Sequence, residues 1–114
     1  MISVEEFNAV VDEQLVMCRE MLVKKTEEYT DGVDPLHNFR SAESLMGSMT
    51  NALAGYMMKH TVSLYDMMKE DPNNFTPERW NEKITDHINY LLLLKAIVVE
   101  ARSEKCTAAC EEVC

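Results

Sequence analysis

Three residues that could bind a cation or a polar ligand follow one another at helical spacing in "WNEKITDHINYLLLLKAIVVE": Glu82, Asp86 and Asn89. In an α-helix they share one face, and that face continues to Leu93 and Ala96. Apolar residues crowd the second half of this segment, which predicts a central helix whose acidic end also faces inward. Inward carboxylates repel one another unless a cation neutralises them, and hard oxygen ligands favour Mg²⁺ or Mn²⁺.

A third carboxylate lies at the end of another predicted helical stripe. The stripe consists of Phe7, Val10, Gln14, Met17 and Met21. It leads to Lys24, Lys25 and Glu28, so antiparallel packing of the two helices would place Glu28 beside Glu82 and Asp86. We therefore expect these three carboxylates to form one metal site. The alternative for each acid alone is an ordinary solvated residue near a helix end.

Glycine and proline are rare, with three of each in 114 residues, which predicts a few long helices. Capping residues and apolar spacing predict helices over about 4–28, 39–46, 50–69 and 77–102, with Ser3 and Thr76 as N-caps. The segment "YTDGVDPLHN" predicts a loop. The expected fold class is all-α: a four-helix bundle or close variant, three long helices plus one short, and we expect it to form a homo-oligomer. Residues 1–102 would form a single domain and 103–114 a tail.

Composition limits the partners and the compartment. Eleven basic and 20 acidic residues give a net charge of −9, which disfavours direct nucleic-acid binding. The sequence has no apolar run of membrane-spanning length and no secretory signal, so we predict a cytoplasmic protein without a membrane partner. The tail cysteines, Cys106, Cys110 and Cys114, are expected to be reduced thiols, with intermolecular disulfides or thiol reactivity favoured over a zinc site.

Three short motifs resemble those of a known family. They are "KTEEY" (25–29), Lys59 with His60, and "EKITDHINY" (82–90). They resemble the Lys-x-x-Asp/Glu-Tyr, central Lys and Glu-x-x-x-Asp-x-x-Asn-Tyr pattern of small phage proteins called nucleotide-modification-associated domains. Those proteins are similar to the all-α nucleoside triphosphate pyrophosphatases of the MazG type. The resemblance covers roughly residues 10–100.

The resemblance implies a helical bundle, often oligomeric, that binds magnesium and cleaves a nucleoside triphosphate to the monophosphate and pyrophosphate. Carried over by motif, the metal-binding and catalytic residues would be Glu28, Glu82 and Asp86. The residues that would contact the substrate are Lys25, Tyr29, Arg40, Lys59, Asn89 and Tyr90. Magnesium would bridge phosphate oxygens and orient the attacking water.

The chain departs from the family pattern at two points. Glu27 and Glu28 are adjacent where the pyrophosphatases carry Glu-x-x-Glu, and adjacent residues cannot face the same way on a helix. Glu82 and Asp86 are four residues apart instead of three, although this spacing still shares a face. Metal binding could therefore survive without catalysis.

Other readings of the same residues remain open. In the predicted loop, His37 and Asn38 could close over a ligand, or they could pack against the loop with Phe39 as anchor. A structural role is favoured for His60. Two rival functions are a non-catalytic protein that sequesters a nucleotide or nucleotide-derived signal, and a helical interaction protein whose Met-rich faces bury a partner or a second copy.

Overall fold

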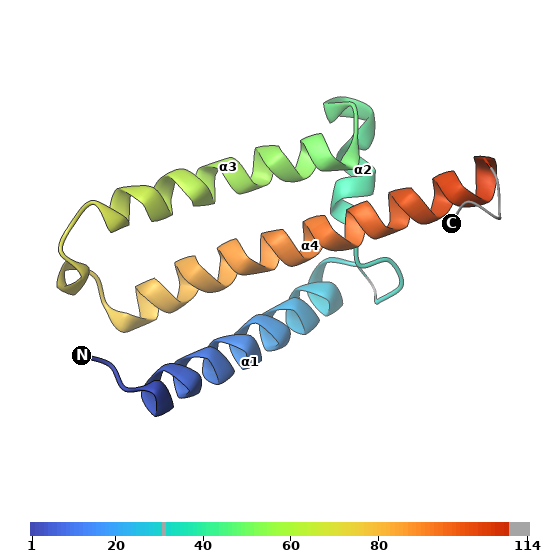
Figure 1. Cartoon of the computed structure of the whole chain (residues 1–114). Coiled ribbons are helices and arrows are strands. Elements are labelled where there is room, and N and C mark those ends of the chain that lie inside the picture. Colours follow the sequence, from blue (N-terminus) through green and yellow to red (C-terminus); the bar gives the residue numbers. More distant parts are fainter. Residues whose placement is uncertain (31, 110–114) are drawn as a thin grey trace.

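The computed structural model describes residues 1–30 and 32–109, except the side chains of residues 29 and 105–109, and this part of the chain is all-α (Figure 1). Its elements in order are α1 (Val4–Tyr29), α2 (His37–Met46), α3 (Met49–Met68), the 3₁₀ helix η1 (Pro72–Asn74) and α4 (Pro77–Ala109). The predicted set of three long helices and one short helix is confirmed.

Side-chain caps start the three long helices. The Ser3 hydroxyl accepts a hydrogen bond from the backbone N–H of Glu6 at 3.0 Å, as the sequence predicts. Thr76 does the same for the N–H of Arg79 at 3.1 Å, and Ser48 caps α3 through Asn51 at 3.1 Å. Each cap satisfies one backbone donor that the first helical turn leaves unpaired.

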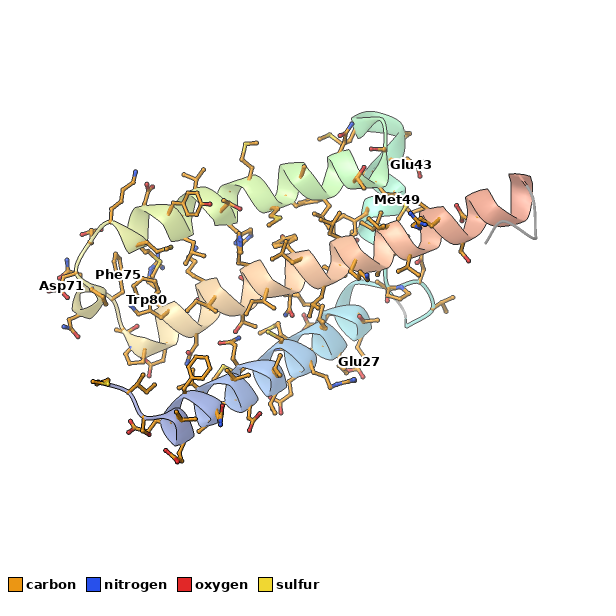
Figure 2. All side chains as sticks on the ribbon, in the orientation of Figure 1. Glu27, Glu43, Met49, Asp71, Phe75 and Trp80 are labelled. Atoms are coloured by element: carbon orange, nitrogen blue, oxygen red, sulfur yellow. The ribbon has the colours of Figure 1, made fainter. Side chains whose placement is uncertain are left out.

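A short connection reverses the chain between α3 and α4. Figure 2 shows Phe75 and Trp80 close together beside this connection, where their rings meet edge to face at 5.7 Å between centroids. The indole N–H of Trp80 donates to the carbonyl of Pro72 at 2.9 Å, and Asp71 accepts from the N–H of Asn73 at 2.9 Å. These contacts fix the turn that makes α3 and α4 antiparallel neighbours.

Two helix boundaries differ from the prediction. α2 begins at His37, two residues before the predicted start at Phe39. The Asp34 carboxylate accepts a hydrogen bond from the N–H of Leu36 at 3.0 Å, which organises the turn before the helix. His37 and Asn38 therefore lie in the first turn of α2 and not in a loop. α4 continues past Arg102 to Ala109, since no glycine or proline interrupts that stretch.

The predicted domain boundary at 102/103 consequently falls within α4. Of the tail cysteines, Cys106 belongs to the helix, although its side chain lies outside the described part of the structure. Cys110 and Cys114 lie outside the described residues altogether, so the predictions made for these thiols stay predictions.

α4 lies between α1 and α3, and α2 crosses one end of this layer (Figure 1). Because the short α2 does not run the length of the bundle, the long helices alternate in direction as α1, α3, α4. α1 and α4 therefore run parallel, and the predicted antiparallel packing of these two helices is wrong. Glu28 lies near the C-terminal end of α1, whereas Glu82 lies near the N-terminal end of the parallel helix α4, so the two residues are far apart along the bundle.

The main core lies where α2, α3 and α4 meet. Its buried members are Leu36, Phe39, Ala52, Leu53 and Ile97. Gly47, with φ of +92°, ends α2 in the left-handed conformation that glycine adopts without strain, which turns the chain into α3. This core therefore holds α2 and α3 against α4.

α1 is attached to α4 separately. Cys18 is buried against α4, and the Gln14 side-chain amide donates to the Thr85 hydroxyl at 2.8 Å. None of the helices in the described part of the chain combines the length and the apolar character that crossing a membrane requires.

Candidate functional site

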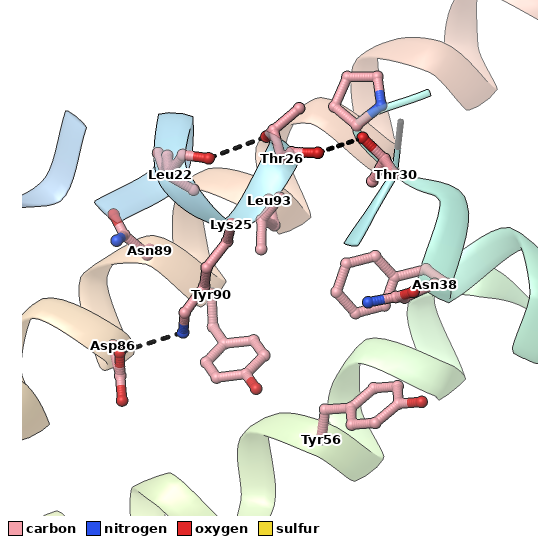
Figure 3. Close-up of a pocket in the computed structure, with 12 residues that line it drawn as sticks. Leu22, Lys25, Thr26, Thr30, Asn38, Tyr56, Asp86, Asn89, Tyr90 and Leu93 are labelled. Carbon is pink, nitrogen blue, oxygen red and sulfur yellow. Dashed lines mark hydrogen bonds and ion pairs between the residues drawn. The ribbon is translucent and has the colours of Figure 1, made fainter. Parts of the chain in front are cut away.

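A cavity of about 260 Å³ opens between the C-terminal half of α1, the first turn of α2, and the middle of α3 and α4 (Figure 3). Its lining residues are Leu22, Lys25, Thr26, Thr30, Pro35, Asn38, Phe39, Tyr56, Asp86, Asn89, Tyr90 and Leu93. The cavity is concave and largely apolar with a few convergent polar groups, which is typical of small-molecule sites. We call it the α1–α4 cavity.

A charged pair lies at one edge of the cavity. The Lys25 ammonium nitrogen is 3.4 Å from Asp86 Oδ1, which joins α1 to α4 (Figure 3). His60 Nδ1 of α3 is 3.9 Å from the other carboxylate oxygen of Asp86. Asp86 thus pairs with the Lys25 cation and lies near the imidazole ring of His60.

Asn89 is the most deeply buried polar residue of the cavity wall, with 5% of its surface exposed. Neither its amide nitrogen nor its amide oxygen has a hydrogen-bond partner among the described residues. A buried amide without partners is costly in a folded protein, and such groups are rare. Asn89 therefore offers an unused NH₂ donor group and an unused carbonyl acceptor at the cavity.

Aromatic rings form the remaining wall. The rings of Phe39 and Tyr56 meet edge to face at 5.8 Å, and the Tyr90 ring lies 5.2 Å from that of His60. Burial raises the pKa of Tyr90, with smaller contributions from the charge of Asp86 and from Tyr56. Flat aromatic faces beside hydrogen-bonding groups suit a planar heterocycle.

Two threonines shape the end of α1 that borders the cavity. The Thr26 hydroxyl donates to the carbonyl of Leu22 at 2.8 Å, and the Thr30 hydroxyl donates to the carbonyl of Thr26 (Figure 3). The Thr30 hydroxyl in turn accepts the N–H of Gly32 at 3.1 Å. These hydrogen bonds hold the last turn of α1 over the cavity.

The cavity brings together five residues that the sequence assigned to the site. They are Lys25, Asn38, Asp86, Asn89 and Tyr90. The fold places other candidates elsewhere: Glu28, His37 and Lys59 are exposed and do not line this cavity. The side chain of Tyr29 lies outside the described part of the structure.

Arg40 is engaged in a different contact. Its guanidinium lies 2.8 Å from an Asp34 carboxylate oxygen and 2.7 Å from one of Glu100, which ties α2 to α4 and to the preceding turn. The hydrogen bonds from Arg40 lower the pKa of both carboxyl groups. This cation contributes to the fold at the far side of α2 and does not line the α1–α4 cavity.

The expected cluster of three carboxylates does not form in a single chain. In the described residues, no group of three His, Cys, Asp or Glu side chains is placed to hold a metal ion. Glu82 and Asp86 do line one groove together, beside Glu20 and Lys24 of α1. Magnesium commonly uses one or two carboxylates together with substrate phosphates and water, so this pair fits an ion that arrives with a phosphate ligand.

Several wall residues escaped the sequence analysis. Tyr56 lies one turn from buried Ala52 and one turn from His60, and this i, i+4 line of α3 was the available signal. Thr26 and Thr30 lie within or directly after the "KTEEY" motif. Phe39, expected to anchor a loop, is buried in the core and also lines the cavity.

Comparison with family models, curated proteins and solved structures finds no match to this chain.

Proposed function

We propose that the protein binds a nucleoside triphosphate with magnesium in the α1–α4 cavity and hydrolyses it to the monophosphate and pyrophosphate. The observation that carries the proposal is the convergence of Lys25, Asp86, Asn89 and Tyr90 on one cavity from two helices far apart in sequence. A cation, a carboxylate, an unpaired amide and aromatic rings are the groups that a nucleotide requires. The resemblance to phage nucleotide-modification-associated domains adds to this proposal.

The base is assigned to the aromatic side of the cavity. Tyr56, Tyr90 and Phe39 provide flat apolar surface, and the Asn89 amide can donate to and accept from a base edge. A base that meets both amide atoms would remove the cost of leaving them unpaired. Asn38, exposed at the start of α2, lies at the rim, where a sugar or base edge would enter.

The phosphates are assigned to the edge that carries Lys25. The Lys25 ammonium pairs with Asp86, but the Lys25 side chain is 45% exposed, so it can turn toward a phosphate oxygen. Asp86 and Glu82 would hold the magnesium ion that accompanies the nucleotide. When bound, this ion neutralises phosphate charge and orients water. An acidic chain requires such a bridge to hold an anion.

In the proposed reaction, water attacks the α-phosphorus, and the bond from this phosphorus to the oxygen that bridges it to the β-phosphorus breaks. That bridging oxygen leaves with pyrophosphate, and the water oxygen stays on the monophosphate. His60 Nδ1 lies 3.9 Å from Asp86 Oδ2, so the His60 ring would take up the proton that the water releases while Asp86 holds the ion. Lys25 compensates the charge on the phosphates during the displacement.

The first test is the melting temperature of the reduced protein with each nucleoside triphosphate, with and without magnesium. Binding to the folded state raises the apparent stability by mass action. We expect a rise with particular triphosphates that depends on magnesium, followed by pyrophosphate release in an enzymatic assay. No rise with any triphosphate would overturn the proposal.

Matched carboxylate variants locate the site. Asp86→Asn and Glu82→Gln should abolish pyrophosphate release while the helical circular dichroism spectrum stays the same. Glu28→Gln is the control, because Glu28 lines neither the α1–α4 cavity nor the groove that Glu82 and Asp86 share. Equal loss of turnover in Glu28→Gln would contradict the assignment of catalysis to this cavity.

A second candidate function is sequestration of a nucleotide or nucleotide-derived signal without turnover. Asp86 is the one carboxylate among the described residues that line the α1–α4 cavity, which favours binding over catalysis. In this case the melting temperature would rise with a signal nucleotide in the absence of magnesium. Asp86→Asn would then keep binding. Either function suits a cytoplasmic protein, located in the host cytoplasm if a phage encodes it.

A further inference from the structure

The amide of Asn89 is out of reach of a ligand in this arrangement of the helices. Solvent has almost no access to its nitrogen or to its oxygen, although Asn89 belongs to the wall of the α1–α4 cavity. A ligand needs at least as much room as a water molecule, so no base edge can pair with this amide while the helices keep these positions. Part of the cavity wall must therefore move before the amide can bind a ligand.

The part of the wall that covers Asn89 belongs to α1. Asn89 follows Thr85 by four residues, so the two side chains share one face of α4. Gln14 of α1 is hydrogen-bonded to Thr85 at 2.8 Å, which places α1 over this face. Lys25 and Thr26 of α1 also line the cavity together with Asn89 (Figure 3). Movement of α1 away from α4 would therefore uncover the amide.

α1 is held less firmly than the helices of the core. The buried cluster that joins α2, α3 and α4 contains no described residue of α1. Among the described side chains of α1, Cys18 is the only one that is buried. The hydrogen bond from Gln14 to Thr85 and the ion pair of Lys25 with Asp86 both lead to α4. α1 therefore depends on its packing against a single helix.

The apolar face of α1 is also incompletely covered. Phe7 and Val10 belong to the apolar stripe that the sequence predicts for this helix, yet each is 54% exposed, and Leu15 is 58% exposed. Most of the stability of a helix in a protein comes from the packing of its apolar face. α1 therefore loses little buried surface when it leaves α4, and its backbone hydrogen bonds open once it is detached.

We propose that α1 is a lid over the α1–α4 cavity, which detaches from α4 while α2, α3 and α4 remain folded together. Opening uncovers Asn89 and admits the ligand. A ligand that contacts both Asn89 and Lys25 then binds across α4 and α1 and holds the lid closed. The opening itself does not depend on the identity of the ligand, whereas closure by a nucleotide rests on the proposed function.

Amide hydrogen exchange of the reduced full chain, followed by NMR without any ligand, tests the opening. We expect protection factors in 10–28 to be at least 100-fold lower than those around Leu53 and Ile97, which exchange only when the whole chain unfolds. Ile97→Val weakens the core but not the contact between α1 and α4. It should therefore speed exchange around Leu53 about three- to tenfold and leave the rates in 10–28 unchanged.

Two further variants probe the contact of the lid. Gln14→Ala removes the hydrogen bond to Thr85 and should speed exchange in 10–28 about tenfold, whereas Glu13→Ala, at the neighbouring exposed position, should not. Equal protection in 10–28 and around Leu53 would overturn the proposal, and so would equal acceleration of both regions by Ile97→Val.

A nucleoside triphosphate with magnesium separates the lid from the ligand that closes it. At a concentration 100 times its dissociation constant, the nucleotide should slow exchange in 10–28 about 100-fold, because it binds only the closed state. If α1 opens by itself but no triphosphate slows its exchange, the lid is supported and the proposed function is wrong.

Discussion

Lys25 of α1 and Asp86 of α4 form an ion pair, with the ammonium nitrogen 3.4 Å from Oδ1, at the edge of the α1–α4 cavity. This ion pair joins the motif "KTEEY" of α1 to the motif "EKITDHINY" of α4. The Lys25 side chain is 45% exposed and that of Asp86 is 14% exposed. Pairs with this much solvent contribute little to stability, about 0–1 kcal/mol, so the pair serves mainly to position the two charges.

The first prediction concerns Asp86→Asn. We expect the free energy of unfolding in urea to fall by less than about 1 kcal/mol, since the lost pair is partly exposed. Relief of carboxylate repulsion from Glu82, which shares a groove with Asp86, would offset part of this loss. The magnesium-dependent thermal shift with nucleotide should disappear. A loss of several kcal/mol would show that Asp86 is a structural residue.

The second prediction concerns acid stability. Hydrogen bonds from Arg40 lower the pKa of Asp34 and Glu100 in the folded state. Both carboxyls therefore stabilise the fold above their unfolded pKa of about 4, and this stability is lost as the pH falls through the lower folded pKa values. Arg40→Met should lower the urea midpoint at pH 7 and make its decline between pH 5 and 3 shallower.

Two comparisons control the arginine test. Arg40→Lys keeps the charge but cannot reproduce the forked hydrogen bonds, so its urea midpoint should lie between those of the wild type and Arg40→Met. Arg19→Met changes an exposed arginine of α1 and should keep the wild-type pH dependence. An unchanged acid profile in Arg40→Met would rule out the Arg40 contacts as its cause.

The third prediction concerns alkaline pH. Burial raises the pKa of Tyr90 in the folded state, so above pH about 10 the unfolded chain releases this proton first. The free energy of unfolding should therefore fall as the pH rises through this range. Tyr90→Phe should weaken this dependence between pH 9 and 11, whereas Tyr65→Phe, at an exposed position, should not. Equal profiles for the two variants would refute the assignment.

The fourth prediction tests the core. Ile97 is 3% exposed among Leu36, Phe39, Ala52 and Leu53. Ile97→Ala should lower the free energy of unfolding by about 2–5 kcal/mol, because it removes buried methyl groups and leaves a cavity. Leu45→Ala, at a residue that is 88% exposed, should change it by less than about 0.5 kcal/mol. A similar cost for both variants would mean that this core is not packed as described.

The helices were predictable because local chemistry determines them. Ser3 and Thr76 are N-caps because each carries a hydroxyl group directly before a helical pattern. Pro77 occupies the first turn of α4. The predicted end of α4, at about Arg102, is seven residues before the observed end at Ala109. The stretch from 103 to 109 contains no glycine or proline, so nothing in its composition ends the helix earlier.

The arrangement of the site was harder to predict, since it depends on helix direction. The inward line of α4 correctly identified Asn89 as buried. The distance between Glu28 and Glu82 depends on whether α4 runs parallel or antiparallel to α1. That direction depends on whether α2 runs the full length of the bundle, and no local sequence pattern shows this. The unused amide of Asn89 also arises only from packing against neighbouring helices.

The last prediction follows from that amide. Asn89→Leu keeps a similar side-chain volume and removes a buried donor and acceptor that have no partner among the described residues, so the free energy of unfolding should rise by about 1 kcal/mol. The same substitution should abolish the nucleotide-dependent thermal shift, because the base edge loses both hydrogen bonds. Asn81→Leu, on the exposed start of α4, should keep the shift. If Asn89→Leu is more stable and still binds, the base does not contact Asn89; if it loses stability, the amide has a partner in solution.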